Sequence, residues 1–285
     1  MTAWVIGKFD ALHRGHRELV RVAAGLGEPG ILSFSGMAEV LGWPPRKPLL
    51  GKSERERVLR DWQVAQVCAL PFAELRELSP AAFVELLVQE HGATAIVTGA
   101  DFRFGRDRAG DVSILAELAR GHGITVRAVE PVQVAGRPAS SSRVRDAIAA
   151  GDVVDAANLL GRQFALNGVV QRGDGRGAGI GFPTANLGSI ETLVPACGVY
   201  AAVAELPDQS PLRAAVNIGH VPTVADQRPL TVEAHLLDFD GDIYGEPLRL
   251  RFVERLRGEQ RFADLDALRE QIARDVVAVA ELPLE

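Results

Sequence analysis

The chain has 285 residues, 47% of them hydrophobic, and a formal net charge of −6. This composition is typical of a globular protein and excludes a disordered or low-complexity chain. The acidic balance, with a pI near 5.6, argues against nucleic acid as a partner, because nucleic-acid-binding surfaces normally carry an excess of basic side chains. At roughly 100–200 residues per domain, the length predicts two domains.

The sequence also limits where the protein is expected to act. No apolar run approaches the roughly 20 residues that span a bilayer, so we expect no membrane partner. Lys8 and Asp10 interrupt the segment in which a secretory signal would need apolar residues, and we therefore expect a cytoplasmic protein. Cys68 and Cys197 lie far apart in apolar segments, which favours two small buried side chains over a redox pair or a structural metal site.

The first half of the chain alternates between apolar strands and amphipathic helices. This rhythm predicts a Rossmann-like α/β domain whose parallel sheet is covered on both faces. The predicted strands are 3–7, 30–34, 64–70, 94–99 and 124–129, and the helical stretches are 16–26, 80–91 and 113–122. Ligands bind such sheets beyond the carboxyl ends of the strands.

One motif, GKFDALHRGH at residues 7–16, directly follows the first strand. A helix that begins there presents unpaired backbone N–H groups and partial positive charge, which receive anions readily. Gly7 allows close approach to the backbone, and His13 and His16 would add two imidazoles. Lys8 and Asp10 of the same motif are further predicted nucleotide-binding residues. The motif predicts an anion-binding cradle, and the alternative is a turn with two solvated histidines.

Beyond Ser140 the pattern changes. The stretches 140–152 and 152–161 are expected to be helices, the first capped by serine and closed by Gly151. Short alternating strands separated by Gly, Pro and Asp turns then predict a small antiparallel barrel of Greek-key type with a packed terminal helix at 263–282. The predicted strands are 164–170, 198–206, 212–219, 231–239 and 248–256. We place the domain boundary between residues 158 and 159.

The segment RGDGRGAGIGFPTAN, residues 172–186, carries a glycine at every second position from 173 to 181. No frame satisfies the dinucleotide-binding fingerprint, and Pro183 opposes the helix which that fingerprint needs. The glycines would let backbone N–H groups face phosphate oxygens, and Thr184 and Asn186 project from one side with oxygens that suit Mg²⁺. The alternative is a mobile barrel loop. The glycines concerned are Gly173, Gly175, Gly177 and Gly181.

Three weaker signals remain. Glu233 shares a strand face with His235, as either a solvated edge residue or a functional carboxylate. Asp101 begins an alternation of polar and aromatic side chains that could hold a flat ring. Ser142 and Arg143, near a helix start, suit an anion, although ordinary helix capping explains the serines equally well.

These motifs together resemble the bacterial bifunctional riboflavin kinase/FAD synthetase family almost from end to end. The matching motifs, in the family's order, are GKFDALHRGH, GADFRFG, SSSRVR, GFPTAN, CGVY, NIGHVPT, VEAHLLDF and LRGEQRF. The resemblance implies that the barrel half phosphorylates riboflavin from ATP to give FMN. It further implies that the sheet half, a nucleotidyltransferase domain, transfers AMP from ATP to FMN, giving FAD and pyrophosphate. Oligomeric state is not implied, and a homo-oligomer remains open.

The resemblance also implies roles for individual residues. Thr184 and Asn186 would hold Mg²⁺ and nucleotide phosphates, and Glu233 would activate the ribityl hydroxyl. In the adenylylation site, four residues would contact ATP phosphates: His13, His16, Ser142 and Arg143. Asp101 matches the loop associated with substrate binding.

Three positions in the first half depart from the family pattern. Ala11 stands where glycine is usual, Lys8 stands where a small or amide residue is usual, and Met37 replaces an expected histidine. A thioether neither carries charge nor donates a hydrogen bond, so one phosphate contact is missing, and our hypothesis is that Lys8 supplies a cation in its place. Two other functions stay open: a riboflavin kinase with a slow, inactive or altered transferase domain, and a flavin-binding protein without turnover.

Overall fold

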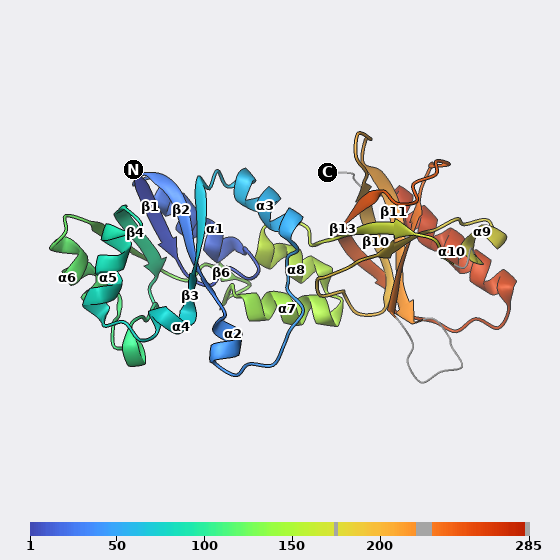
Figure 1. Cartoon of the computed structure of the whole chain (residues 1–285). Coiled ribbons are helices and arrows are strands. Elements are labelled where there is room, and N and C mark those ends of the chain that lie inside the picture. Colours follow the sequence, from blue (N-terminus) through green and yellow to red (C-terminus); the bar gives the residue numbers. More distant parts are fainter. Residues whose placement is uncertain (174–175, 221–229, 283–285) are drawn as a thin grey trace. The chain divides into compact units, whose positions relative to one another are not determined.

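The computed structural model describes residues 1–173, 176–220 and 230–282 (Figure 1). They divide into two compact units, Met1–Ser141 and Ser142–Glu285. This division falls at the start of a helix pair, α7 (Ser141–Ala150) and α8 (Val153–Leu160), whereas the predicted boundary falls near its end. The boundary at residues 158 and 159 therefore stays a prediction.

The first unit contains a five-stranded parallel sheet with the strand order β3-β2-β1-β4-β5. All five predicted strands are present, as β1 (Thr2–Ile6), β2 (Glu28–Ser35), β3 (Gln66–Pro71), β4 (Ala93–Gly99) and β5 (Thr125–Val129). The strand order reverses direction between β1 and β4, and such a switch point is where open α/β sheets bind ligands. The segments that follow β1 and β4 therefore leave the sheet at its binding edge.

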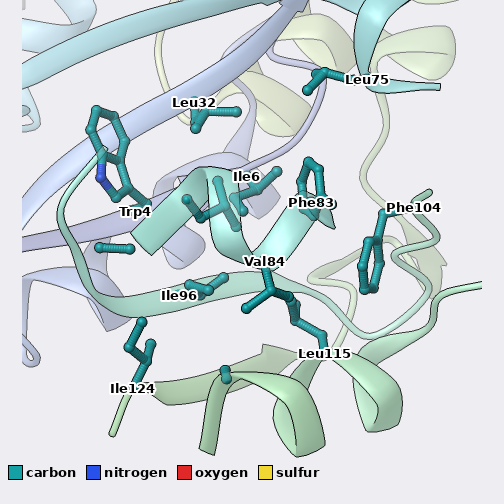
Figure 2. Packing of buried hydrophobic residues seen from close by; sticks show 13 residues of the cluster. Trp4, Ile6, Leu32, Leu75, Phe83, Val84, Ile96, Phe104, Leu115 and Ile124 are labelled. Atoms are coloured by element: carbon teal, nitrogen blue, oxygen red, sulfur yellow. The ribbon is translucent and has the colours of Figure 1, made fainter. Parts of the chain in front are cut away.

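Helices cover both faces of this sheet, as the apolar strands predict. Alternate residues of β1 point to opposite sides: Ala3 and Val5 pack with α1 and α3, whereas Trp4 and Ile6 pack with α5 and α6. Figure 2 shows the second of these clusters. The helices are α1 (Arg14–Ala24), α2 (Met37–Val40), α3 (Lys52–Asp61), α4 (Phe72–Leu75), α5 (Pro80–Gln89) and α6 (Val112–Arg120), with a 3-10 turn at Arg106–Arg108 and a hairpin of β6 (Gln133–Val134) and β7 (Arg137–Pro138).

The second unit is built around a closed barrel with the order β10-β11-β12-β9-β8-β13. Strand β9 lies beside β12 although β10 and β11 intervene in the chain, which is a Greek-key connection. The strands are β8 (Ala165–Gln171), β9 (Ala185–Gly188), β10 (Gly198–Glu205), β11 (Leu212–His220), β12 (Leu230–Leu236) and β13 (Pro247–Arg257). The antiparallel barrel is confirmed; β9, only four residues long, is the strand that the sequence did not reveal.

The terminal helix α10 (Leu265–Ala280) packs on the outside of the barrel, as predicted, with Val279 against Ala201 and Leu237. A buried ion pair reinforces this packing. The guanidinium of Arg257, at the end of β13, donates to Asp275 Oδ2 from Nε at 3.0 Å and from Nη2 at 2.8 Å. The ion pair and the apolar cluster together join α10 to the barrel. A short helix, α9 (Arg176–Gly179), lies in the glycine-rich segment before β9.

Candidate active sites

A cavity of about 1050 Å³ lies in the first unit. Its walls include residues that directly follow β1 and β4, the two strands at the switch point. Five of the predicted site residues line it together: Gly7, Lys8, His13, His16 and Asp101. The sequence motifs after the two strands, separated by more than 80 residues in the chain, thus form one site.

His13 and His16 form a reciprocal cap at the start of α1. The Gly15 N–H donates to His13 Nδ1 at 3.1 Å, and the His13 N–H donates to His16 Nδ1 at 3.3 Å. Their rings stack with centroids 3.8 Å apart, and both side chains are buried. The two histidines are therefore structural parts of the helix terminus rather than solvated turn residues.

This arrangement determines which ring nitrogen each histidine offers to a ligand. Since each Nδ1 accepts a backbone N–H, each neutral ring carries its proton on Nε2. The first turn of α1 contains no acidic side chain that would oppose an anion. Two Nε2–H donors beside a helix N-terminus fit the predicted anion cradle.

Lys8 brings an ammonium group, ion-paired with Asp10, to the wall of the cavity. Lys8 Nζ lies 2.9 Å from Asp10 Oδ2 and 4.7 Å from the centroid of the Trp43 ring. Trp43 and Met37 also line the cavity, so the ammonium group shares a wall with the thioether that replaces a histidine. Trp43 was not anticipated from the sequence, because nothing in the loop 41–51 indicates that it folds back over residues 7–10.

The loop after β4 supplies aromatic side chains. Phe102 and Phe104 stack with centroids 5.7 Å apart and planes 10° from parallel, and both line the cavity beside Asp101. Phe104 is largely a core residue: it packs on Phe83, and a Cβ at Gly110 would come within 2.6 Å of its ring. The cavity wall thus contains a fixed aromatic pair, and its role as a platform for a flat ring stays a prediction.

The serine-rich segment is only partly accounted for. Ser140 and Ser141 line the cavity, whereas Ser142 and Arg143, at the start of α7, belong to the second compact unit. Phosphate binding by Ser142 and Arg143 therefore stays a prediction.

On the barrel, four polar side chains stand in register on adjacent strands. Gln171 of β8 pairs with Asn186 of β9, Asn186 pairs with Glu233 of β12, and Glu233 pairs with Asn217 of β11. Residues directly opposite one another lie on the same face, with Cβ atoms about 4.5–5.5 Å apart. We call Gln171, Asn186, Glu233 and Asn217 the polar row. Val232 and Ala234, on either side of Glu233, are buried, so the row lies on the outer face of the barrel.

The glycine-rich segment packs closely on this row. A Cβ at Gly173 would lie 2.8 Å from Asn186 Oδ1, and a Cβ at Gly177 would lie 3.2 Å from Thr184 Oγ1. Gly181 needs to be glycine for another reason, because its φ is +90°. Two of the predicted phosphate-binding glycines are thus in contact with the two predicted metal ligands. Gly175 lies outside the described residues.

His235 fixes the PTAN segment from the next strand. Its Nδ1 lies 2.7 Å from the carbonyl oxygen of Pro183, and its ring meets Phe182 edge to face at 5.6 Å. Thr184 and Asn186 are therefore held in an extended conformation that presents both side chains from one side. Within 1–173, 176–220 and 230–282, no group of three or more His, Cys, Asp or Glu side chains could hold a metal ion. A Mg²⁺ ion here would depend on the neutral oxygens of Thr184 and Asn186.

Comparison with known proteins matches the two halves of the chain to two different family models. An FAD synthetase family model matches residues 1–143 and a riboflavin kinase family model matches residues 160–282. The chain is 38% identical to the bifunctional riboflavin kinase/FMN adenylyltransferase of Pseudomonas fluorescens and 36% identical to that of Escherichia coli K12; each match covers 97% of this chain and 91% of the relative. The chain belongs to the bifunctional riboflavin kinase/FMN adenylyltransferase family. A crystal structure of a macrolide-efflux protein from Streptococcus pneumoniae, 31% identical, superimposes with a TM-score of 0.89 over 99% of this chain and 95% of that one.

The structure explains one of the departures from the family pattern. Ala11 is fully buried, and the residue with a positive φ in this loop is Leu12, at +48°. Since the backbone at position 11 does not need left-handed geometry, alanine is accommodated without strain.

Proposed function

We propose that the chain carries out both reactions of its family, with the polar row phosphorylating riboflavin and the cavity of the first unit adenylylating FMN. The observation that carries this proposal is the pairing of Asn186 with Glu233 across β9 and β12. It brings the segment predicted to bind Mg²⁺ and phosphates directly beside a carboxylate, which supports assigning them to one reaction centre.

In the kinase reaction, the terminal ribityl hydroxyl of riboflavin attacks the γ-phosphorus of ATP. An alcohol is a poor nucleophile, so the reaction needs a base, and Glu233 would accept the hydroxyl proton as the new P–O bond forms and ADP leaves. Such assistance is worth roughly 10²–10⁴-fold in rate. Thr184 and Asn186 would hold Mg²⁺, which when bound neutralises charge on the phosphates. Gly173 and Gly177 let the backbone pack directly against Asn186 and Thr184, so their N–H groups would lie close to these ligands.

The adenylyl transfer requires different help. A phosphate oxygen of FMN attacks the α-phosphorus of ATP, and pyrophosphate leaves. Because this nucleophile is already anionic, it needs no base; the site must instead bring two anions together and stabilise charge on the α-phosphate and the leaving group. The Nε2–H groups of His13 and His16, the N–H groups of the first turn of α1 and the ammonium group of Lys8 would provide this.

A single incubation tests the proposal. Purified protein with riboflavin, ATP and MgCl₂ is expected to form FMN and then FAD, separable by chromatography. FMN alone would support the kinase with an impaired transferase, and tight flavin binding without either product would support a non-catalytic binding protein.

Two variants assign the sites. Glu233→Gln is expected to lose roughly 10²–10⁴-fold in FMN formation while still converting supplied FMN to FAD. His13→Asn should do the reverse, because asparagine retains the helix cap and loses the imidazole. Equal loss of both activities in either variant would contradict two separate sites.

The same proposal has consequences for location and assembly. None of the helices in the described part of the chain is long and apolar enough to cross a membrane. We place the enzyme in the cytoplasm, where ATP is available, and leave a homo-oligomer as an outcome that light scattering of the purified protein would decide.

A further inference from the structure

One arginine outside the motifs quoted above contacts the loop between β1 and α1. Arg55, in α3, donates from Nη1 to the carbonyl oxygen of Phe9 at 2.7 Å. Val58 and Leu59, one turn further along α3, are buried against the sheet. The donor is therefore carried by a helix that the core holds in place, while the acceptor belongs to the loop between β1 and α1.

That loop needs to be held. Leu12 has a φ of +48°, which is uncommon for a residue with a branched side chain, and it is completely buried. Strained backbone of this kind persists only where its surroundings over-determine it, and it concentrates at functional sites. Burial of the Leu12 and Phe9 side chains supplies part of this restraint. The hydrogen bond from Arg55 holds the carbonyl group of Phe9.

Phe9 connects this restrained loop to the cavity, because its ring packs against one of the two histidines. The Phe9 ring lies 4.8 Å from the His16 ring, centroid to centroid, and His16 in turn receives the N–H of His13. A shift of the Phe9 backbone would therefore move both imidazoles.

Charge supports the same contact. Burial lowers the pKa of the Arg55 guanidinium, and the negative charge of Asp10 opposes this shift. Asp10 thus interacts electrostatically with two cations, Lys8 at 2.9 Å and Arg55 of α3. Arg55 in this position offsets the negative charge of Asp10, which belongs to the same loop as the predicted phosphate-binding residues.

We propose that Arg55 is a positioning residue for adenylyl transfer, holding the Phe9 carbonyl so that His13 and His16 meet the nucleotide phosphates. This inference rests on the proposed function of the cavity. It predicts that loss of the hydrogen bond slows FAD formation without affecting riboflavin phosphorylation on the barrel.

The test compares three variants of the full chain. Arg55→Met removes the donor and keeps the length of the side chain, Arg55→Lys keeps one donor, and Arg60→Met is the control on an exposed position of the same helix. FAD formation from supplied FMN is measured well below the thermal midpoint of each variant, and FMN formation by the same preparation is the internal reference. We expect Arg55→Met to lower kcat for FAD formation by about 10²-fold, as for a misplacement of about 1 Å, with Arg55→Lys recovering most of it.

The outcomes separate positioning from stability. A purely structural role would lower the thermal midpoint of Arg55→Met but leave kcat at the lower temperature equal to that of the wild type, and that result would overturn the inference. Arg55→Lys as slow as Arg55→Met would also overturn it, because the hydrogen bond would then not be responsible. If the wild type makes no FAD, the proposed function itself fails, which is a different result from a wild type and an Arg55→Met variant that are equally active.

Discussion

Adding one methyl group at Gly173 tests whether the position of Asn186 matters for riboflavin phosphorylation. In Gly173→Ala, the Cβ would lie 2.8 Å from Asn186 Oδ1 and closer still to its amide nitrogen, where ordinary contact begins at 3.4 Å. The amide must therefore move by several tenths of an ångström at its oxygen and further at its nitrogen. Because misplacement of a positioning group by about 1 Å costs on the order of 10²-fold in rate, we expect FMN formation to fall by about that factor.

Gly179→Ala is the matched control. Gly179 lies in the same segment, but a Cβ there has no heavy atom within 4 Å and its φ is not positive. We expect Gly179→Ala to phosphorylate riboflavin like the wild type, and both variants to convert supplied FMN to FAD at the wild-type rate. Initial rates of FMN and FAD formation, followed by chromatography, measure both. A Gly173→Ala enzyme with unchanged FMN formation would show that Asn186 does not need its observed position, and would refute its assignment as a metal ligand.

Two further predictions concern charge. Lys8→Asn should slow FAD formation by roughly 10- to 150-fold, the loss of one charge-assisted hydrogen bond of about 1.5–3 kcal/mol, and an unchanged rate would remove Lys8 as the replacement for the histidine missing at Met37. Burial raises the pKa of Glu205, but hydrogen bonds and charge from Arg249 and Arg251 outweigh it and leave that pKa below its ordinary value. The interaction of ionised Glu205 with Arg249 and Arg251 thus stabilises the barrel above pH ~4.3, and this contribution is lost as the pH falls through the lowered pKa of Glu205. Urea unfolding of Glu205→Gln should show a smaller loss on acidification than the wild type, whereas parallel curves would contradict the assignment.

The sequence predicted the sheet and most of the barrel because their strands are apolar enough, and regular enough, to be recognised locally. Strand β9 was not predicted, because four residues are too few to show an alternating pattern. Thr184, directly before the strand, and Asn186, within it, were nevertheless identified as candidate site residues. Helix α3 escaped because few of its residues are apolar: Val58 and Leu59 are buried, but charged side chains dominate the rest. Since the sequence did not reveal α3, the contact of its residue Arg55 with Phe9 could not be predicted either.

For the candidate sites too, local patterns could be predicted and long-range pairing could not. Motifs that directly follow a strand were located correctly, since the carboxyl end of a parallel strand defines where the next residues lie. Gln171 and Asn217 were not identified as partners of Glu233, because strand register alone brings them into one row. Register depends on long-range pairing, and no local pattern in the chain contains it.

The two candidate sites differ in the side chains that they bring together. The polar row contains a carboxylate next to neutral oxygens, which suits removal of a proton from an alcohol. In the cavity, the segment after β1 contributes Lys8 and two imidazoles whose Nδ1 atoms accept backbone N–H groups, which suits contact with phosphates, while carboxylates such as Asp101 and Glu130 also line the cavity. In the capped histidine pair, the hydrogen bonds that begin α1 also select the tautomer of each neutral ring. The same two Nδ1 atoms therefore stabilise the start of α1 and leave the proton of each ring on Nε2, where it could contact a phosphate. A substitution that keeps the helix cap but removes the Nε2–H group would separate folding from catalysis.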